Sequence, residues 1–145
     1  MAELLHLNGA DLHCQGSAMM SPLHLEAKNS DVEVAQKLIE YSVNISAEDL
    51  HGCTPLHVAS QCDHKDCSIL QLLLEHGANV NTRRMDSSTP LHRASLLGAP
   101  EAVCLLLEHG ADAKAEDENG VTALQATERF EKEEVEKLLR EYNAK

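Results

Sequence analysis

Histidine and cysteine gather in one short stretch of the chain, and these residue types could bind a metal. Positions 51 to 67 hold His51, Cys53, His57, Cys62, His64 and Cys67. Thiolates and imidazoles in sets of three or four are the ligands of zinc sites. No C-x-x-C pair and no H-x-x-x-H pair occurs here, so the usual spacing of such a site is missing. We therefore expect no metal and no cofactor, and keep a metal-binding or enzymatic protein that uses segment 51–67 as an alternative hypothesis.

Three further positions could be proposed as general bases, because His24, His57 and His92 recur at regular spacing. A catalytic base is needed once, beside a nucleophile and an orienting partner. A histidine that recurs in every unit is better explained as part of the scaffold. The sequence also has no G-x-S-x-G motif, no glycine-rich phosphate loop and no metalloprotease helix. We therefore predict that the protein is not an enzyme.

Each of these histidines ends a four-residue motif that repeats along the chain. The motif reads SPLH at 21–24, TPLH at 54–57 and 89–92, and TALQ at 122–125, so successive copies begin 33, 35 and 33 residues apart. A second series of positions, with glycine at 9, 77 and 110 and serine at 42, precedes each copy by 12 residues. Two markers in one register indicate a repeat architecture.

Each repeat predicts a pair of helices. Thr or Ser supplies an N-cap oxygen, and Pro at the first helical position loses nothing by lacking an N–H group. A second, amphipathic helix is expected at 68–76 and at 101–109, each with a run of three leucines. Gly77 and Gly110 should end these helices, because glycine adopts the left-handed conformation without strain. The polar residues that follow must cross to the next pair, and an extended hairpin suits them.

The sequence T-P-L-H-x-A at a period near 33, followed by L-L-L-E-H-G-A-D/N, resembles the ankyrin-repeat family. The resemblance covers nearly the whole chain. It implies an all-α solenoid of stacked helix-turn-helix units with β-hairpin loops and a concave groove. We expect one domain, 1–145, divided into a half repeat 1–15, repeats 16–48, 49–83 and 84–116, and a C-terminal capping repeat 117–145.

The two ends of this array differ. In the last repeat, polar Glu136 and Arg140 stand where an inner repeat has apolar residues, Val103 and Leu107. A polar outer face is what a terminal capping repeat needs, because no neighbour covers it. The N-terminus begins within a second helix, which leaves an apolar edge. We expect self-association, or continuation of the array, at that edge.

Composition and charge argue against several function classes. The 145 residues carry 12 Lys and Arg against 24 Asp and Glu, and this net charge of −12 repels phosphate backbones and anionic lipid. Aromatic residues make up only 2%, too few to stack bases. Five scattered cysteines fit reduced thiols. We expect no nucleic acid, no membrane, and an intracellular, reducing location in the cytoplasm or nucleus.

One basic cluster, Arg83, Arg84 and Arg93, interrupts the acidic background. These are either ordinary solvated charges or binding residues, since arginine is enriched at binding hot spots. In the ankyrin-repeat family, hairpin tips and inner helix faces line the groove. By this resemblance, the residues that would contact a partner are Leu50, His51, Gln61, Arg83, Arg84, Met85, Asp86, Arg93, Leu96 and Leu97.

We therefore predict a non-catalytic protein-protein interaction module that binds a partner protein or peptide through its concave groove and hairpin tips. A structural spacer or oligomerisation unit of a longer repeat array is a further alternative. Two departures from the repeat have no assigned role. Residues 60–68 contain a two-residue insertion, which a surface loop tolerates. Glu26 takes the place of Ala59 and Ala94, and it either faces the groove or marks a looser first repeat.

Overall fold

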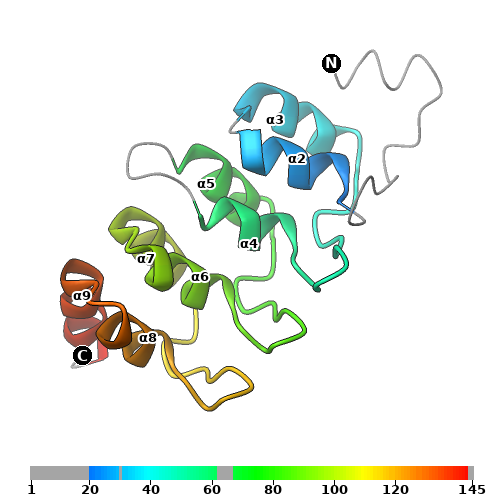
Figure 1. Ribbon diagram of the computed structural model, residues 1–145. Helices are drawn as coiled ribbons and strands as arrows, with labels where there is room; N and C mark the ends of the chain where they lie inside the picture. The colour runs from blue at the N-terminus through cyan, green and yellow to red at the C-terminus, as the bar shows by residue number, and fades with distance from the viewer. Residues whose placement is uncertain (1–19, 30, 62–66, 144–145) are drawn as a thin grey trace.

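The computed structural model is a row of helix pairs with loops that project to one side (Figure 1). It describes residues 20–29, 31–61 and 67–143, so the half repeat expected at 1–15 lies outside the described residues. The helices in these ranges are α2 (Pro22–Asn29), α3 (Val32–Glu40), α4 (Pro55–Ala59), α5 (Ser68–Glu75), α6 (Pro90–Leu97), α7 (Pro100–Glu108), α8 (Ala123–Arg129) and α9 (Glu133–Asn143). Within the same ranges, no helix is long and apolar enough to cross a bilayer.

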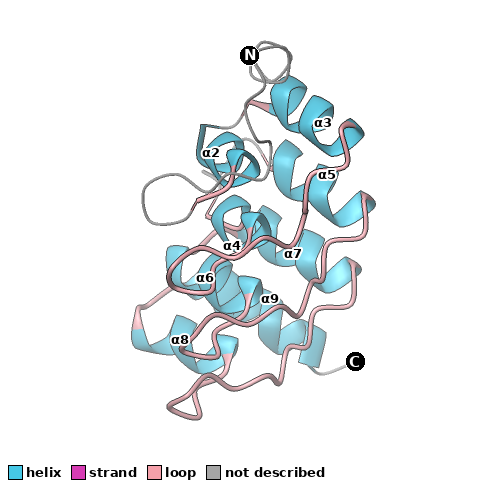
Figure 2. Ribbon diagram, turned by 90° about the vertical axis from the view of Figure 1, so that its right-hand side faces the viewer, coloured by secondary structure: helices cyan, strands magenta, loops and turns pink. Residues whose placement is uncertain are grey.

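Each helix packs against its partner in the pair and against the equivalent helix of the next pair. The inner row runs α2, α4, α6, α8, and the outer row runs α3, α5, α7, α9 (Figure 2). A repeat array is held together by such nearest-neighbour contacts. The arrangement confirms the all-α solenoid predicted from the sequence.

The inner helices begin at the predicted Thr caps. Thr54 Oγ1 accepts a hydrogen bond from the His57 N–H at 3.4 Å, and His57 Nδ1 accepts one from the Thr54 N–H at 3.1 Å. Thr89 begins α6 in the same way. In the last unit Gln125 replaces the histidine, and its Oε1 accepts from the Thr122 N–H at 2.9 Å. These reciprocal bonds satisfy two backbone donors at each helix start.

The second ring nitrogen of each motif histidine binds the following unit. The bonds from Nε2 run from His24 to the Cys53 carbonyl at 2.7 Å, from His57 to the Ser88 carbonyl at 3.2 Å, and from His92 to the Val121 carbonyl at 2.8 Å. Because Nδ1 accepts from the cap N–H, the proton of each neutral ring sits on Nε2. The histidines are therefore part of the scaffold, as the repeat indicated.

Leucines and alanines fill the space between the helices. In the outer row, Leu38, Leu73, Leu106 and Leu139 repeat in register, and each is at most 1% exposed. Burial of a leucine side chain contributes about 2 kcal/mol. The small alanines Ala35 and Ala102 are fully buried. The core is therefore continuous along the array, and each unit depends on its neighbours for burial.

The outer helices end at the predicted glycines, because Gly77 and Gly110 have φ values of +86° and +90°. The preceding residues add a bond of their own. Nδ1 of His76 and of His109 donates to a carbonyl four residues earlier, at 2.9 and 2.8 Å. Each ring therefore adds a second hydrogen bond to a carbonyl of the last helical turn that already accepts the backbone N–H of the same histidine.

The last helix carries the predicted polar outer face. Arg140 Nε donates to Glu136 Oε1 at 2.9 Å, and Arg140 Nη2 donates to Glu128 Oε1 at 2.6 Å. Val135 and Leu139, on the opposite face of α9, are fully buried. The helix therefore closes the core on one side and presents charge on the other.

The loops that precede α4, α6 and α8 are tight turns, and we call residues 49–53, 84–88 and 117–121 the finger loops. In the first and last, the Asp49 N–H donates to the Cys53 carbonyl at 2.9 Å and the Asp117 N–H to the Val121 carbonyl at 3.0 Å. Extended pairing is limited: in the part of the chain that the structure describes, the β-structure is one isolated bridge between Glu116 and Thr122.

The buried histidines predict that acid destabilises the array. Burial lowers the pKa of His57 to about 4 from an ordinary 6.5, with Arg84 and Arg93 acting in the same direction, against the Ser88 carbonyl and Asp86. The unfolded chain therefore binds the proton first as the pH falls. The contribution of neutral His57 is complete above pH 6.5 and is lost towards pH 4, by about 3 kcal/mol. Urea unfolding at a series of pH values measures this loss.

His57→Gln is the matched control, because Gln125 makes the same cap bond in the last unit. Glutamine does not titrate, so the variant should lose less free energy of unfolding than the parent between pH 6.5 and pH 4. An unchanged pH dependence in the variant would show that His57 does not set it.

Candidate partner-binding surface

Two of the three finger loops are organised by an aspartate. Asp49 Oδ1 accepts hydrogen bonds from the His51 N–H at 2.8 Å and the Cys53 N–H at 3.0 Å. Asp117 makes the equivalent two bonds at 2.8 and 3.0 Å. Such side-chain bonds to the backbone hold a turn in shape. Each of these loops also has a glycine with positive φ as its fourth residue.

The middle finger loop departs from this pattern at both positions. Arg84 stands where its neighbours have aspartate, and Ser87 stands where they have glycine. Ser87 has a φ of +64°, a left-handed conformation that costs a residue with a Cβ about 1–2 kcal/mol. Asp86 takes over part of the missing role, because its Oδ1 accepts from the Ser88 N–H at 3.0 Å and the Ser88 hydroxyl at 2.6 Å. The loop therefore keeps its shape and presents a guanidinium instead of a carboxylate.

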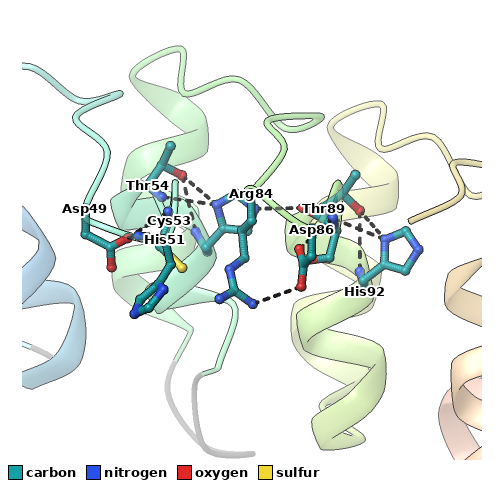
Figure 3. A network of polar contacts seen from close by, with 10 residues as sticks. Asp49, His51, Cys53, Thr54, Arg84, Asp86, Thr89 and His92 are labelled. Carbon is teal, nitrogen blue, oxygen red and sulfur yellow. Dashed lines mark hydrogen bonds and ion pairs between the residues drawn. The ribbon is translucent and has the colours of Figure 1, made fainter. Parts of the chain in front are cut away.

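The side chain of Arg84 lies between Cys53 of the first finger loop and Asp86 of its own loop (Figure 3). Its side chain is 19% exposed, and Nη1 is 3.5 Å from Asp86 Oδ2. The Nε atom is buried and has no hydrogen-bond partner among the described residues. Burial raises the pKa of the Cys53 thiol, although the charge of Arg84 and a side-chain hydrogen bond with Arg84 oppose the change. The guanidinium therefore retains unused hydrogen-bonding capacity.

A hollow of about 210 Å³ opens beside Arg84, between the middle and last finger loops and the helices α6 and α8. Its lining carries three arginines and two aspartates: Arg84, Arg93, Arg129, Asp86 and Asp117. Leu96 and Phe130 form an apolar part of the wall. The hydrogen bonds from Ser88 and the charge of Arg84 outweigh burial and lower the pKa of Asp86. Charged and apolar groups thus converge in one concavity.

The structure brings four of the ten sequence-predicted residues to this hollow, namely Arg84, Asp86, Arg93 and Leu96. Gln61 joins them from the end of α4: with its amide oxygen turned towards Arg93, it accepts from Nε at 3.1 Å. Leu50, Met85 and Leu97 are 53%, 77% and 48% exposed. Their side chains are therefore available to a partner on the loops and on α6.

His51 connects two finger loops through its backbone. Its carbonyl accepts from the Met85 N–H at 3.0 Å. Gly52, with a φ of +76°, permits this approach, because a Cβ at that position would lie 3.0 Å from the Met85 nitrogen. The first two loops are therefore fixed relative to each other, and the exposed His51 side chain is left at their rim.

Arg83 has different surroundings from Arg84. Its Nη1 donates to the Ser87 carbonyl at 3.0 Å and to the Glu116 carbonyl at 2.8 Å. The side chain therefore ties the middle loop to the start of the last one. This use of Arg83 is structural, whereas the described contacts of Arg84 leave donors unused.

Sequence reasoning missed the part of the hollow that belongs to the last unit. Arg129 and Phe130 stand 33 residues after Leu96 and Leu97, which were selected, and Asp117 stands 33 residues after Arg84. Extending the repeat by one step would have found all three. Phe130 is 54% exposed, so its ring faces solvent rather than the core.

A second hollow, of about 270 Å³, lies between the outer helices α7 and α9 and is lined by Cys104, Leu107, Leu138 and Tyr142, with Glu108 and Glu141 at its edge. Burial, with Glu108 and Glu101, raises the pKa of the Cys104 thiol. A protonated thiol is a poor nucleophile. This concavity lacks the convergent donors found beside Arg84.

The structure assigns the Cys- and His-rich segment other roles. No group of three or more His, Cys, Asp or Glu in the described ranges could hold a metal ion, and Cys62 and His64 lie outside those ranges. His57 is bound on both ring nitrogens. Cys53 is a free thiol. Cys67 is disulfide-bonded, which corrects the expectation that every thiol is reduced.

The two remaining departures are only partly described. Of the insertion at 60–68, residues 62–66 lie outside the described part. Glu26 lies on α2 and is half-buried, and burial together with the nearby charge of Asp31 raises its pKa. Its repeat equivalents Ala59 and Ala94 are 3% and 0% exposed. The first inner helix is therefore less tightly covered at this position than the next two.

Comparison with known proteins agrees with this architecture. A family model described as ankyrin repeats in three copies matches residues 1–84, 52–117 and 66–145. The chain belongs to the ankyrin-repeat family. Over 44 residues, or 30% of this chain, it is also 43% identical to human Rabankyrin-5 (Homo sapiens), of which the match covers 4%. The matched segment is therefore a small part of that relative.

The contrast between the two neighbouring arginines of this ankyrin array can be measured. Methionine keeps a long apolar stem but removes the donors, so Arg83→Met loses two hydrogen bonds and should lower the free energy of unfolding by about 1 kcal/mol. Arg84→Met removes a buried, unpaired nitrogen and should leave stability unchanged or higher. Urea unfolding of both variants compares them. A larger loss in Arg84→Met than in Arg83→Met would contradict the contacts described here.

Proposed function

We propose that this chain is a protein-protein interaction module that holds a partner protein or peptide in the concave groove between its finger loops and inner helices. Ankyrin repeats are generally such modules. The observation that carries the proposal is the hollow beside Arg84, where three arginines, one of them with a nitrogen that has no hydrogen-bond partner, meet the apolar wall of Leu96 and Phe130. Arginine and aromatic residues are enriched at the energetic centres of interfaces.

Apolar side chains on either side of the hollow extend the proposed surface. Leu50 and Met85 project from two finger loops, and Leu97 and Phe130 come from the ends of α6 and α8; all four are more than a third exposed. Their backbones are held by the inter-unit hydrogen bonds described above. Side chains on such pre-ordered elements lose little entropy on binding. The surface thus offers apolar anchors around a charged centre.

The proposed role is non-catalytic. Among the described residues, the buried histidines His24, His57 and His92 use both ring nitrogens in structural bonds. A base committed in this way cannot take a proton from a substrate without breaking the array. An intracellular location and the repeat boundaries stay predictions from the sequence, as do the open N-terminal edge and its self-association.

Charge reversal in the groove tests the proposal. Arg84→Glu combined with Arg93→Glu should reduce binding of groove partners at least tenfold, because charge repulsion replaces attraction at the centre of the surface. At pH 8, where His57 is neutral with or without the two arginines, the melting temperature should stay nearly unchanged, because neither guanidinium supports the core. Affinity capture from the native cell extract with quantitative mass spectrometry measures partner loss, and thermal unfolding measures stability.

The matched control is Lys114→Glu with Lys137→Glu, which changes the net charge equally at two exposed positions on the last two units. This control should retain the captured partners. If the parent and the groove variant capture the same amount of partner, Arg84 and Arg93 do not contribute to binding. If the groove variant and the control variant lose partners equally, the effect comes from total charge alone.

A further inference from the structure

We propose that the hollow beside Arg84 is a subsite for one acidic side chain, Asp or Glu, of an extended partner segment, and that Leu96 and Phe130 receive an apolar residue next to it. This inference rests on the proposed function and names the chemistry of the partner. Nothing in the repeat itself requires it, because the equivalent loop position is aspartate in the units on both sides.

The donors are placed for a carboxylate. Arg84 and Arg93 both line the hollow, one from the middle finger loop and one from α6. Arg84 is held with Nε buried, and Gln61 holds Arg93 from the side of the preceding unit. The Arg84 guanidinium, fixed in this way, presents its outer nitrogens as a planar fork, which matches a carboxylate in two parallel hydrogen bonds, whereas Gln61 already takes Nε and Nη2 of Arg93.

Asp86, the ion-pair partner of Arg84, does not use the full hydrogen-bonding capacity of the guanidinium. Asp86 Oδ2 is 3.5 Å from Nη1, longer than the 2.7–2.9 Å typical of a charge-assisted hydrogen bond. Asp86 Oδ1 is committed to Ser88. An incoming carboxylate can therefore bond to Arg84 without displacing the contact that holds the loop.

The net charge of the residues that line the hollow favours a ligand group with one negative charge. Three arginines against two aspartates leave the hollow with a net charge of +1. One carboxylate balances that charge, whereas a phosphate group of charge near −2 would also face Asp86 and Asp117 at close range. The lining therefore favours Asp or Glu over a phosphorylated residue.

The position of the hollow favours a side chain over a chain terminus. It lies between the last two units of the array, with Gln61 of the preceding unit on one side and Phe130 of the last unit on the other. An extended segment can continue in both directions from this point, towards exposed Met85 and exposed Phe130. The acidic residue is therefore internal to the bound segment.

Selection from a random dodecapeptide library displayed on phage, with the whole chain as bait, tests the subsite. We expect selected peptides to share an internal Asp or Glu next to an apolar residue. Synthetic copies with that acid changed to its amide should bind roughly ten- to hundredfold more weakly by fluorescence anisotropy. Arg84→Met should cause a similar loss, and Arg84→Lys an intermediate one, because lysine keeps the charge but not the fork.

A charge exchange separates this inference from the proposed function. Arg84→Glu should lose the acidic peptide and regain affinity for the same peptide with Lys at that position, while Arg140→Met, on the outer face of α9, should bind like the parent. Peptides that depend on Leu97 or Phe130 but not on Arg84 would overturn the subsite and leave the interaction module standing. Failure to select any groove-dependent peptide would overturn both.

Two further outcomes would also overturn the assignment. A phosphoserine peptide that binds more tightly than its Asp counterpart would show that the hollow takes a dianion. If amidation of the peptide C-terminus abolishes binding and replacement of the internal acid does not, the groove binds a C-terminal carboxylate.

Discussion

The hydrogen bond from each motif histidine to the next unit is the interaction on which the rest of the molecule depends. One ring nitrogen accepts from the cap of the histidine's own helix, and the other donates to a carbonyl 29 or 31 residues further along. The accepting residues Cys53, Ser88 and Val121 each close a finger loop. The same bond therefore links consecutive units and fixes each loop over the inner helices. Because Nδ1 can accept the cap bond only when the ring is neutral, protonation of His57 breaks the cap of its own helix.

The electrostatics of the groove and the stability of the array are coupled at the middle loop. His57 donates to Ser88, and this is the longest of the three bonds at 3.2 Å. The charges of Arg84 and Arg93 help to lower the pKa of His57, so the basic groove favours the neutral ring that the scaffold requires. An acidic chain with a net charge of −12 has few places where such a positive centre can be maintained. In this chain the positive centre lies beside His57, whose cap bond needs the neutral ring.

Features that recur with the period of the repeat could be predicted from the sequence. The directions of individual side chains in the loops could not. Two markers in one register sufficed for the family, the helix pairs, the Thr caps and the polar face of α9, because caps and core positions are set by local rules that recur in every unit. Arg83 and Arg84 could not be told apart in this way, since adjacent residues of a turn point in different directions. Arg129 and Phe130 were not predicted, because they lie outside the cluster of Arg83, Arg84 and Arg93 and only the register of the repeat points to them.

The hydrogen bonds of Arg140 and Arg83 distinguish these two arginines from Arg84. Arg140 is bonded to Glu136 and Glu128, and Arg83 to two backbone carbonyls, so the described structure accounts for both. Arg84 replaces an aspartate that would have organised its loop, and the loop then relies on Asp86 and on a strained Ser87. A buried nitrogen without a partner adds to that cost. The hydrogen bonds that shape the loop do not require arginine at position 84, and the proposed anionic partner would use its free donors.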